Sequence, residues 1–69
     1  MPTYQVTYFN AKDDVIDSEA IFMKSLTNAK RSAGHYAPGG TNIIEIRDLM
    51  GQVLSRLTPD EGWVDDIKE

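Results

Sequence analysis

Ser25-Leu26-Thr27-Asn28-Ala29-Lys30-Arg31-Ser32-Ala33-Gly34 is the stretch, residues 25–34, that shows the clearest helical pattern in this chain. Ser25 suits the position before a helix, because its hydroxyl can accept a hydrogen bond from a first-turn amide that has no partner within the helix. Gly34 is typical of a helix C-terminus, and Pro38 lies shortly beyond it. The apolar residues that recur at helical spacing are Phe22, Leu26, Ala29 and Ala33. The sequence therefore predicts a helix over about residues 26–34, with a narrow alanine-rich face that can lie close to a sheet.

Strand patterns precede this helix. Residues 3–9 are rich in β-branched and aromatic side chains, which favours a strand. The alternation places Tyr4, Val6 and Tyr8 on one face of that strand. Residues 10–14 form a polar turn, and residues 15–22 are expected to return as a second strand.

Strand patterns also follow the helix and the loop at residues 35–41. The expected elements are a strand at residues 42–47, its partner at residues 52–57, and a short last strand or an irregular tail at residues 63–67 that tucks Trp63 inward. Asp48 and Gly51 predict a hairpin turn between the first two of these, because Asp suits a type I turn and Gly suits the left-handed residue after it. A second turn is expected at residues 58–62.

The predicted order ββαβββ indicates one α+β domain that spans residues 1–69. We expect a mostly antiparallel sheet of four to five strands with one helix packed on one face. The absence of cysteine excludes disulfides and thiolate zinc sites, and a single histidine is too few for a histidine-built metal site. No window approaches the roughly 20 apolar residues of a membrane helix, and we see no secretory signal, so a cytoplasmic location is expected.

The sequence does not assemble a catalytic or metal site. Ser32 and His35 are a conceivable nucleophile and base, but no third group to orient them is evident. The acidic pairs at residues 13–14 and 65–66 are typical of solvated surface charge, and the pattern of a calcium loop is absent. We therefore expect a protein that is not an enzyme and that needs no metal or cofactor.

The basic residues gather in the middle of the chain, although the formal net charge is −4. The overall acidity argues against direct binding to nucleic acid. The candidate partner-binding residues are Lys24, Asn28, Arg31 and His35, which follow helical spacing along one face, together with Lys30 and Tyr36 beside them. This face is either a solvated helix surface or a docking patch for an acidic partner. Arg31 is the best candidate for a bidentate contact to a carboxylate or phosphate. Trp63 is either an interface anchor or a core residue.

Several motifs together resemble the small phage-encoded anti-CRISPR proteins that inhibit type I-F systems. These motifs are Ser-Leu-x-x-Ala-Lys-Arg at residues 25–31, Gly40-Thr41, the Ile-x-Ile strand that follows, Gly51, and Gly62-Trp63-Val64-Asp65. The similarity covers roughly residues 25–66, and its most specific pieces are Ser-Leu-x-x-Ala-Lys-Arg and Trp-Val-Asp.

The resemblance implies an inhibitor without enzymatic activity that acts in the host cytoplasm. Such proteins dock on the repeated backbone subunit of the RNA-guided surveillance complex and obstruct pairing of target DNA with the guide. Lys30 and Arg31 fall on the basic pair of the family's helix, whereas the family's later basic and glutamine contacts have no match at residues 35–39. The CRISPR subtype and the oligomeric state stay open. The alternatives are a small phage or mobile-element module that binds another protein, and a weak nucleic-acid binder.

Overall fold

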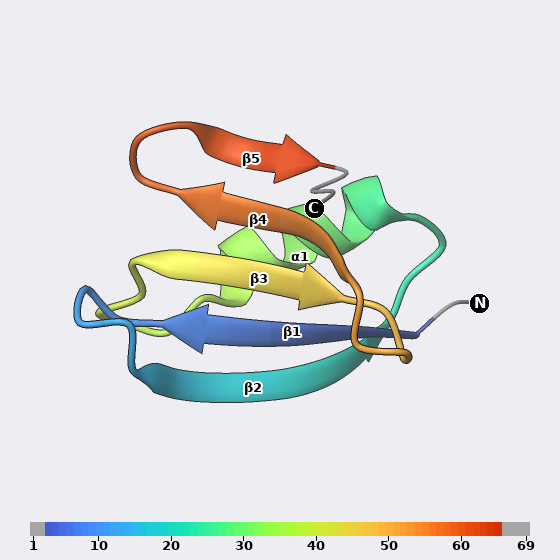
Figure 1. Ribbon diagram of the computed structural model, residues 1–69. Helices are drawn as coiled ribbons and strands as arrows, with labels where there is room; N and C mark the ends of the chain where they lie inside the picture. The colour runs from blue at the N-terminus through green and yellow to red at the C-terminus, as the bar shows by residue number, and fades with distance from the viewer. Residues whose placement is uncertain (1–2, 66–69) are drawn as a thin grey trace.

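The computed structural model describes residues 3–65, and these residues form a single sheet with one helix (Figure 1). The elements are β1 (Thr3–Phe9), β2 (Val15–Phe22), α1 (Leu26–Tyr36), β3 (Ile43–Arg47), β4 (Val53–Thr58) and β5 (Gly62–Asp65). Every neighbouring pair of strands is antiparallel, and the strand order is β2-β1-β3-β4-β5. The predicted α+β architecture is confirmed. No helix within residues 3–65 has both the length and the apolar character needed to cross a bilayer.

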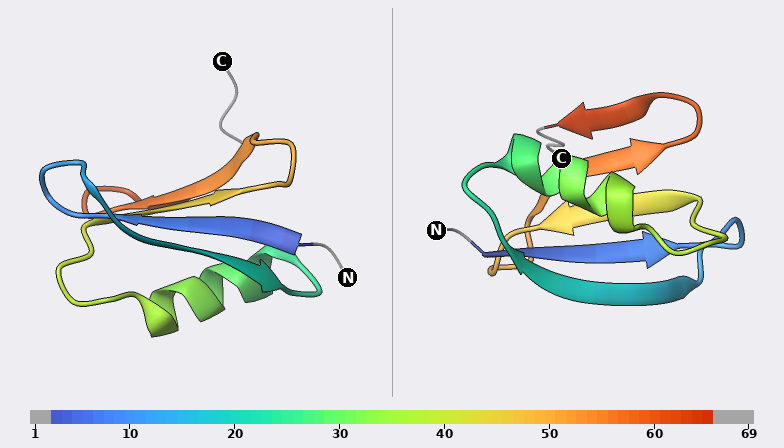
Figure 2. Two further views of the ribbon diagram at one scale, coloured as in Figure 1. Left: turned by 90° about the horizontal axis from the view of Figure 1, so that it is seen from below. Right: turned by 180° about the vertical axis from the view of Figure 1, so that it is seen from behind.

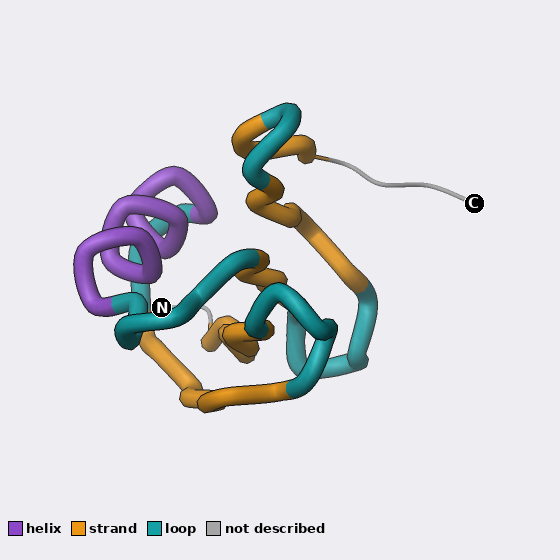
Figure 3. The backbone as a smooth tube through the Cα atoms, turned by 90° about the vertical axis from the view of Figure 1, so that its left-hand side faces the viewer, coloured by secondary structure: helices purple, strands orange, loops and turns teal. Residues whose placement is uncertain are grey.

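Helix α1 packs against one face of the sheet, and among residues 3–65 no other element covers the opposite face (Figure 2). Figure 3 shows the same arrangement from the side, with the helix on one side of the strands. The buried core consists of Tyr4, Val6 and Tyr8 from β1, Ile44 and Ile46 from β3, and Ala29 and Ala33 from α1. The strand alternation and the alanine stripe therefore predicted the central contact of the fold correctly.

The helix begins as predicted but ends later. The hydroxyl of Ser25 accepts the backbone amide of Asn28 at 3.3 Å, as an N-cap does. The prediction that Gly34 ends the helix was wrong, because α1 continues through Gly34 to Tyr36. Ala37 leaves the helical conformation with ψ 131°. Ala37 precedes Pro38, and the ring of a proline disfavours helical geometry in the residue before it. The proline therefore ends this helix.

Phe22 does not join the apolar stripe of the helix, so that part of the prediction was wrong. Phe22 is the last residue of β2, pairs with Thr3 of β1, and is 66% exposed. Because Tyr4 points toward the helix, its neighbour Thr3 and the paired Phe22 lie on the opposite, uncovered face. The pairing of β2 with β1 thus determines the direction of the Phe22 side chain. The helical spacing between Phe22 and Leu26 has no effect on it, because Phe22 precedes the N-cap residue Ser25 and lies outside the helix.

The predicted hairpin after β3 is present. One carboxylate oxygen of Asp48 accepts the backbone amides of Met50 and Gln52, each at 2.9 Å. Gly51 has φ 85°, a backbone conformation that glycine adopts without the steric cost of a side chain. The chain then returns as β4, whose bounds differ by one residue from the expected strand.

The C-terminal part of the described chain is a strand and not an irregular tail. Trp63 pairs with Leu57 across β4 and β5, and it packs partly buried against the core. The structure therefore supports the core interpretation of Trp63. The expected end of this element at residues 66–67 lies outside the described residues.

Candidate partner-binding site

The outer face of α1 is formed by the side of the helix that points away from the sheet. Ala29 and Ala33 are 0% and 1% exposed against the strands. On the helix, Asn28, Arg31 and His35 are exposed, and each lies three or four residues from the next. The predicted spacing along one face is therefore matched by the exposure of these three side chains. We call Asn28, Arg31 and His35 the outer row.

The prediction that Lys24 continues this row was wrong, and Tyr36 lies at the other end of the helix. Lys24 is exposed, but it precedes the N-cap residue Ser25 and so lies before the first helical turn. Tyr36 belongs to the last helical turn and not to the loop, and it is 69% exposed. Its ring meets the ring of His35 edge-on, with centroids 4.9 Å apart. The C-terminal end of α1 thus presents an aromatic surface beside the outer row.

Lys30 has a different position from the other candidates. Its ammonium group forms an ion pair with the carboxylate of Asp65 on β5, and its side chain is only 16% exposed. The same nitrogen lies 5.8 Å from the centre of the Trp63 ring, within the range of a cation–π contact. Lys30 therefore connects the helix to the last strand, and much of its charge is used within the fold.

The partner of Lys30 is itself held in place. The hydroxyl of Ser55 donates a hydrogen bond to the Asp65 carboxylate at 2.6 Å. The hydrogen bond from Lys30, followed by the one from Ser55, lowers the pKa of Asp65 below its usual value. Both donors favour the ionised form of the Asp65 carboxylate, so Asp65 stays ionised to a lower pH than an ordinary aspartate does.

Arg31 is the free cation of the outer row. Within residues 3–65 its guanidinium group makes no ion pair, whereas Lys30, Arg47 and Arg56 each lie against a carboxylate. A guanidinium presents several donors in a planar fork that matches a carboxylate or phosphate. Arg31 is thus available for a bidentate contact with a partner.

The sequence raised Ser32 and His35 as a conceivable nucleophile and base, and its acidic residues as conceivable metal ligands. No hydrogen bond joins the side chains of Ser32 and His35, both of which lie within residues 3–65. Among these same residues, no group of three or more histidine, cysteine or acidic side chains is arranged to hold a metal ion. The exposed side of the helix can bind a partner through charge and shape.

Comparison with family models, with curated proteins and with solved structures found no match for this chain.

A charged group that the sequence did not single out lies on the uncovered face. Glu45 in the middle of β3 is 6% exposed, although no helix lies over it. Its carboxylate accepts the Nε–H of Arg47 at 2.6 Å and lies 4.0 Å from Nε of Arg56. The alternation in the run Ile-Glu-Ile indicates the face of Glu45, but its burial between two arginines depends on strand pairing.

A second unexpected pair joins β1 to the edge strand. The hydroxyl of Tyr8, which is 1% exposed, donates a hydrogen bond of 2.7 Å to Glu19. Burial raises the pKa of Tyr8 far above its usual value, and the hydrogen bond and the negative charge of Glu19 raise it further. Asp17 adds a smaller contribution in the same direction. Tyr8 therefore stays protonated in the folded protein.

We expect this pair to make the protein less stable at high pH. Above the unfolded tyrosine pKa of 10.0, the unfolded chain releases a proton that folded Tyr8 keeps. The unfolded state then binds fewer protons, so the free energy of unfolding falls as pH rises, with a slope approaching about 1.4 kcal/mol per pH unit. Urea titrations from about pH 9 to about pH 11 will measure this slope. The variant Tyr8→Phe serves as the control, and an equal slope in both proteins would contradict the assignment.

Proposed function

We propose that this protein is a non-enzymatic inhibitor that binds the backbone subunit of a type I CRISPR surveillance complex in the host cytoplasm. The outer row of α1 forms the contact, and its occupation of the subunit blocks pairing of target DNA with the guide RNA. The observation that supports this most directly is the exposed guanidinium of Arg31, which has no ion-pair partner within residues 3–65. The motifs shared with anti-CRISPR proteins suggest the identity of the partner.

Contacts at the first turn of α1, along its inner face and to β5 fix the position of the helix on the sheet. Ala29 and Ala33 place the helix directly on the sheet, Ser25 caps its first turn, and Lys30 ties it to Asp65. A surface that is already ordered loses little conformational entropy on binding, which favours affinity. The cationic side chains of α1 also attract an acidic partner surface from a distance, and this attraction weakens as salt is added.

Lys30 and Arg31 are the two basic residues that the resemblance identifies as binding candidates, and their surroundings in the structure differ. Lys30 would have to leave Asp65 and Trp63 before it could reach a partner, so a charge reversal there disturbs the fold as well as any interface. Arg31 is exposed and has no such internal role among residues 3–65. A charge reversal at Arg31 alone is therefore the cleaner test of the proposal.

Substituting Arg31→Glu is expected to weaken binding to the surveillance complex about 10- to 100-fold, because a charged hydrogen bond contributes about 1.5–3 kcal/mol. The measurement is size-exclusion co-elution with purified type I complexes of several subtypes, followed by titration with the subtype that binds. Lys12→Glu is the matched control, because Lys12 is exposed in the turn between β1 and β2 and the charge change is the same. Co-elution of Arg31→Glu at the wild-type level would refute the docking face. Failure to bind any subtype would refute the inhibitor assignment.

A second candidate function is an accessory module that binds another protein through a sheet edge. Strand β2 lies at one edge of the sheet, and residues 15–20 are all exposed. An edge strand offers unpaired backbone donors and acceptors to another strand. Sedimentation at increasing protein concentration distinguishes the two candidates, since self-association through β2 without affinity for any CRISPR complex would favour the accessory module.

A further inference from the structure

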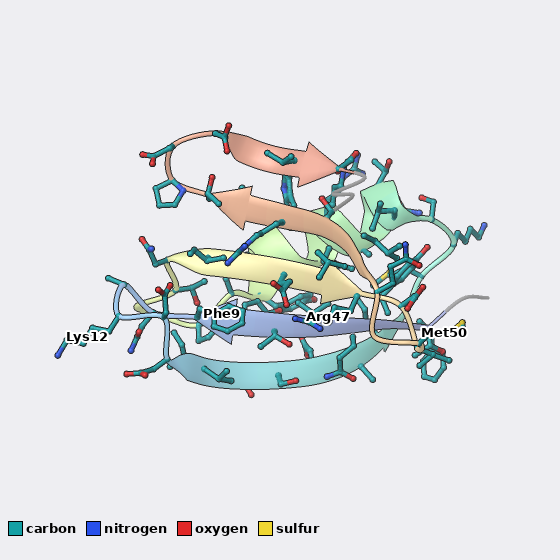
Figure 4. The ribbon with its side chains drawn as sticks, in the orientation of Figure 1. Phe9, Lys12, Arg47 and Met50 are labelled. Atoms are coloured by element: carbon teal, nitrogen blue, oxygen red, sulfur yellow. The ribbon has the colours of Figure 1, made fainter. Side chains whose placement is uncertain are left out.

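The uncovered face of the sheet is a feature of the fold that the proposed function does not use. Figure 4 looks onto this face and labels Phe9 and Arg47, which lie on it from β1 and β3. The register explains their direction, because the preceding residues Tyr8 and Ile46 point to the helix and are buried. Within residues 3–65, α1 lies only on the opposite side (Figure 2).

The centre of this face carries an excess of positive charge. Glu45 lies directly across from Arg56, and two residues before Arg47 on the same strand. The Nε and Nη2 atoms of Arg47 both lie 2.6 Å from one oxygen of Glu45. Arg56 lies 4.0 Å from the other oxygen, beyond hydrogen-bond distance, and 45% of its side chain is exposed. One carboxylate thus orients two guanidinium groups and leaves the donors of Arg56 available.

One end of the same face is apolar. The exposed fractions are 66% for Phe22, 75% for Leu49 and 92% for Met50. Phe22 pairs with Thr3 at the start of β1, and Leu49 and Met50 follow Arg47, which pairs with Gln5 near the same end of β1. We call Phe22, Leu49 and Met50 the apolar corner.

The turn that carries Leu49 and Met50 belongs to the uncovered face. Figure 2 shows the turn between β3 and β4 rising on the side away from the helix, and Figure 4 labels Met50 at this end of the sheet. The Nη1 group of Arg47 donates a hydrogen bond to the carbonyl of Gly51 at 3.2 Å. The guanidinium therefore holds the turn, and it joins the apolar corner to the arginine pair.

We infer that the uncovered face is a second docking surface, which binds an acidic segment of a partner protein that carries a large apolar side chain. Carboxylates of the segment pair with Arg56 and with the exposed edge of Arg47, and the apolar side chain packs on Phe22, Leu49 and Met50. Charge complementarity selects this occupant, since two arginines share one buried carboxylate.

Other occupants fit the face less well. A second copy placed face to face would bring Arg56 and Arg47 against the same arginines of its partner, and like charges repel. Single-stranded nucleic acid needs a series of aromatic platforms along a basic groove, whereas Phe9 and Phe22 lie at opposite ends of β1. Both occupants are outcomes that the experiment below detects.

The test is a backbone-amide NMR titration of the ¹⁵N-labelled protein with a capped polyglutamate peptide that has a central phenylalanine. We expect saturable shifts at the amides of Thr7, Glu45, Arg56 and Met50, which report the face and its apolar corner. Arg56→Gln should lower the affinity for the peptide at least about fivefold, because the variant loses the positive charge. Glutamine is chosen because a glutamate there would face Glu45. Met50→Ser should lower the affinity for the peptide about threefold, because it removes an apolar side chain that the peptide contacts. Met50 is 92% exposed, so the fold does not depend on it.

The controls separate this surface from the outer row of α1. Lys12→Glu changes the charge at an exposed site in the β1–β2 turn, and it should bind the peptide as the wild type does. A capped polylysine peptide with the same phenylalanine should cause no saturable shift. The inference is overturned by shifts confined to α1, by no saturable binding, or by unchanged affinity in Arg56→Gln. Tighter binding of an oligothymidine at the same amides, or shifts that appear on concentrating the protein alone, would also overturn it.

Discussion

Replacing Ile46 with alanine is expected to destabilise the protein by about 2–5 kcal/mol. Ile46 is 0% exposed and lies in the middle of the sheet, where it pairs with Val6 on one side and Ser55 on the other. The substitution removes buried methyl groups and leaves a cavity that the neighbouring strands can close only in part. A chain of 69 residues has a total stability of roughly 3–10 kcal/mol, so the loss is a large share of the total.

Urea unfolding, monitored by far-ultraviolet circular dichroism, measures this loss of stability. Ile16→Ala on the edge strand is the matched control, because Ile16 is 41% exposed and the atoms removed are the same. Ile46→Val is used if the alanine variant does not fold, and it should lower the free energy of unfolding by about 0.5–1.5 kcal/mol. Equal losses for Ile46→Ala and Ile16→Ala would show that Ile46 is not in the core.

Enlarging the helix side of the core is expected to have the next largest effect. Substituting Ala29→Leu should destabilise the protein by about 1–3 kcal/mol, because the added carbons must push α1 away from the sheet. Ala29 is 0% exposed, and its neighbour one turn later, Ala33, is 1% exposed, so the interface has no room for a larger side chain. Leucine is nearly as good a helix former as alanine, so a loss of this size reports packing and not helix propensity.

Thermal unfolding of Ala29→Leu is compared with that of Thr27→Leu, which places the same side chain at an exposed position of the same helix. A shift of 1 kcal/mol lowers the melting temperature of a domain of this size by roughly 4–8 °C. We expect a clear decrease for Ala29→Leu and a change within about 0.5 kcal/mol for Thr27→Leu. Equal melting temperatures for the two variants would mean that the helix does not approach the sheet as closely as the structure shows.

These stability effects bear on the proposed function. The outer row of α1 is presented by the same helix whose inner face carries Ala29 and Ala33. A variant such as Ala29→Leu that moves the helix should therefore lose binding together with stability. Arg31→Glu should lose binding alone, because substitutions at exposed positions usually change stability by less than about 0.5 kcal/mol. The comparison separates the docking contact from the scaffold that holds it.

Local patterns in the sequence determined most of the elements. The alternation of Tyr4, Val6 and Tyr8 identified the buried face of β1, because successive side chains of a strand point to opposite sides. Ser25 identified the start of the helix, and Asp48 with Gly51 identified the hairpin, because caps and turns depend on residues only a few positions apart. Pro38 was a better signal for the helix end than Gly34, since a proline acts on the residue before it whatever the tertiary context.

The tertiary structure alone decided which charges are free. Lys30 and Arg31 are adjacent and cationic, yet Lys30 faces Asp65 and Trp63 of β5 while Arg31 faces solvent. The direction of Phe22, the burial of Glu45 between two arginines and the hydrogen bond from Tyr8 to Glu19 likewise depend on which strands pair and in what register. Local rules of spacing and propensity act within one element, whereas these contacts join residues far apart in the chain. The sequence by itself thus determined the elements and their faces, and the packing of those elements decided which side chains remain available to a partner.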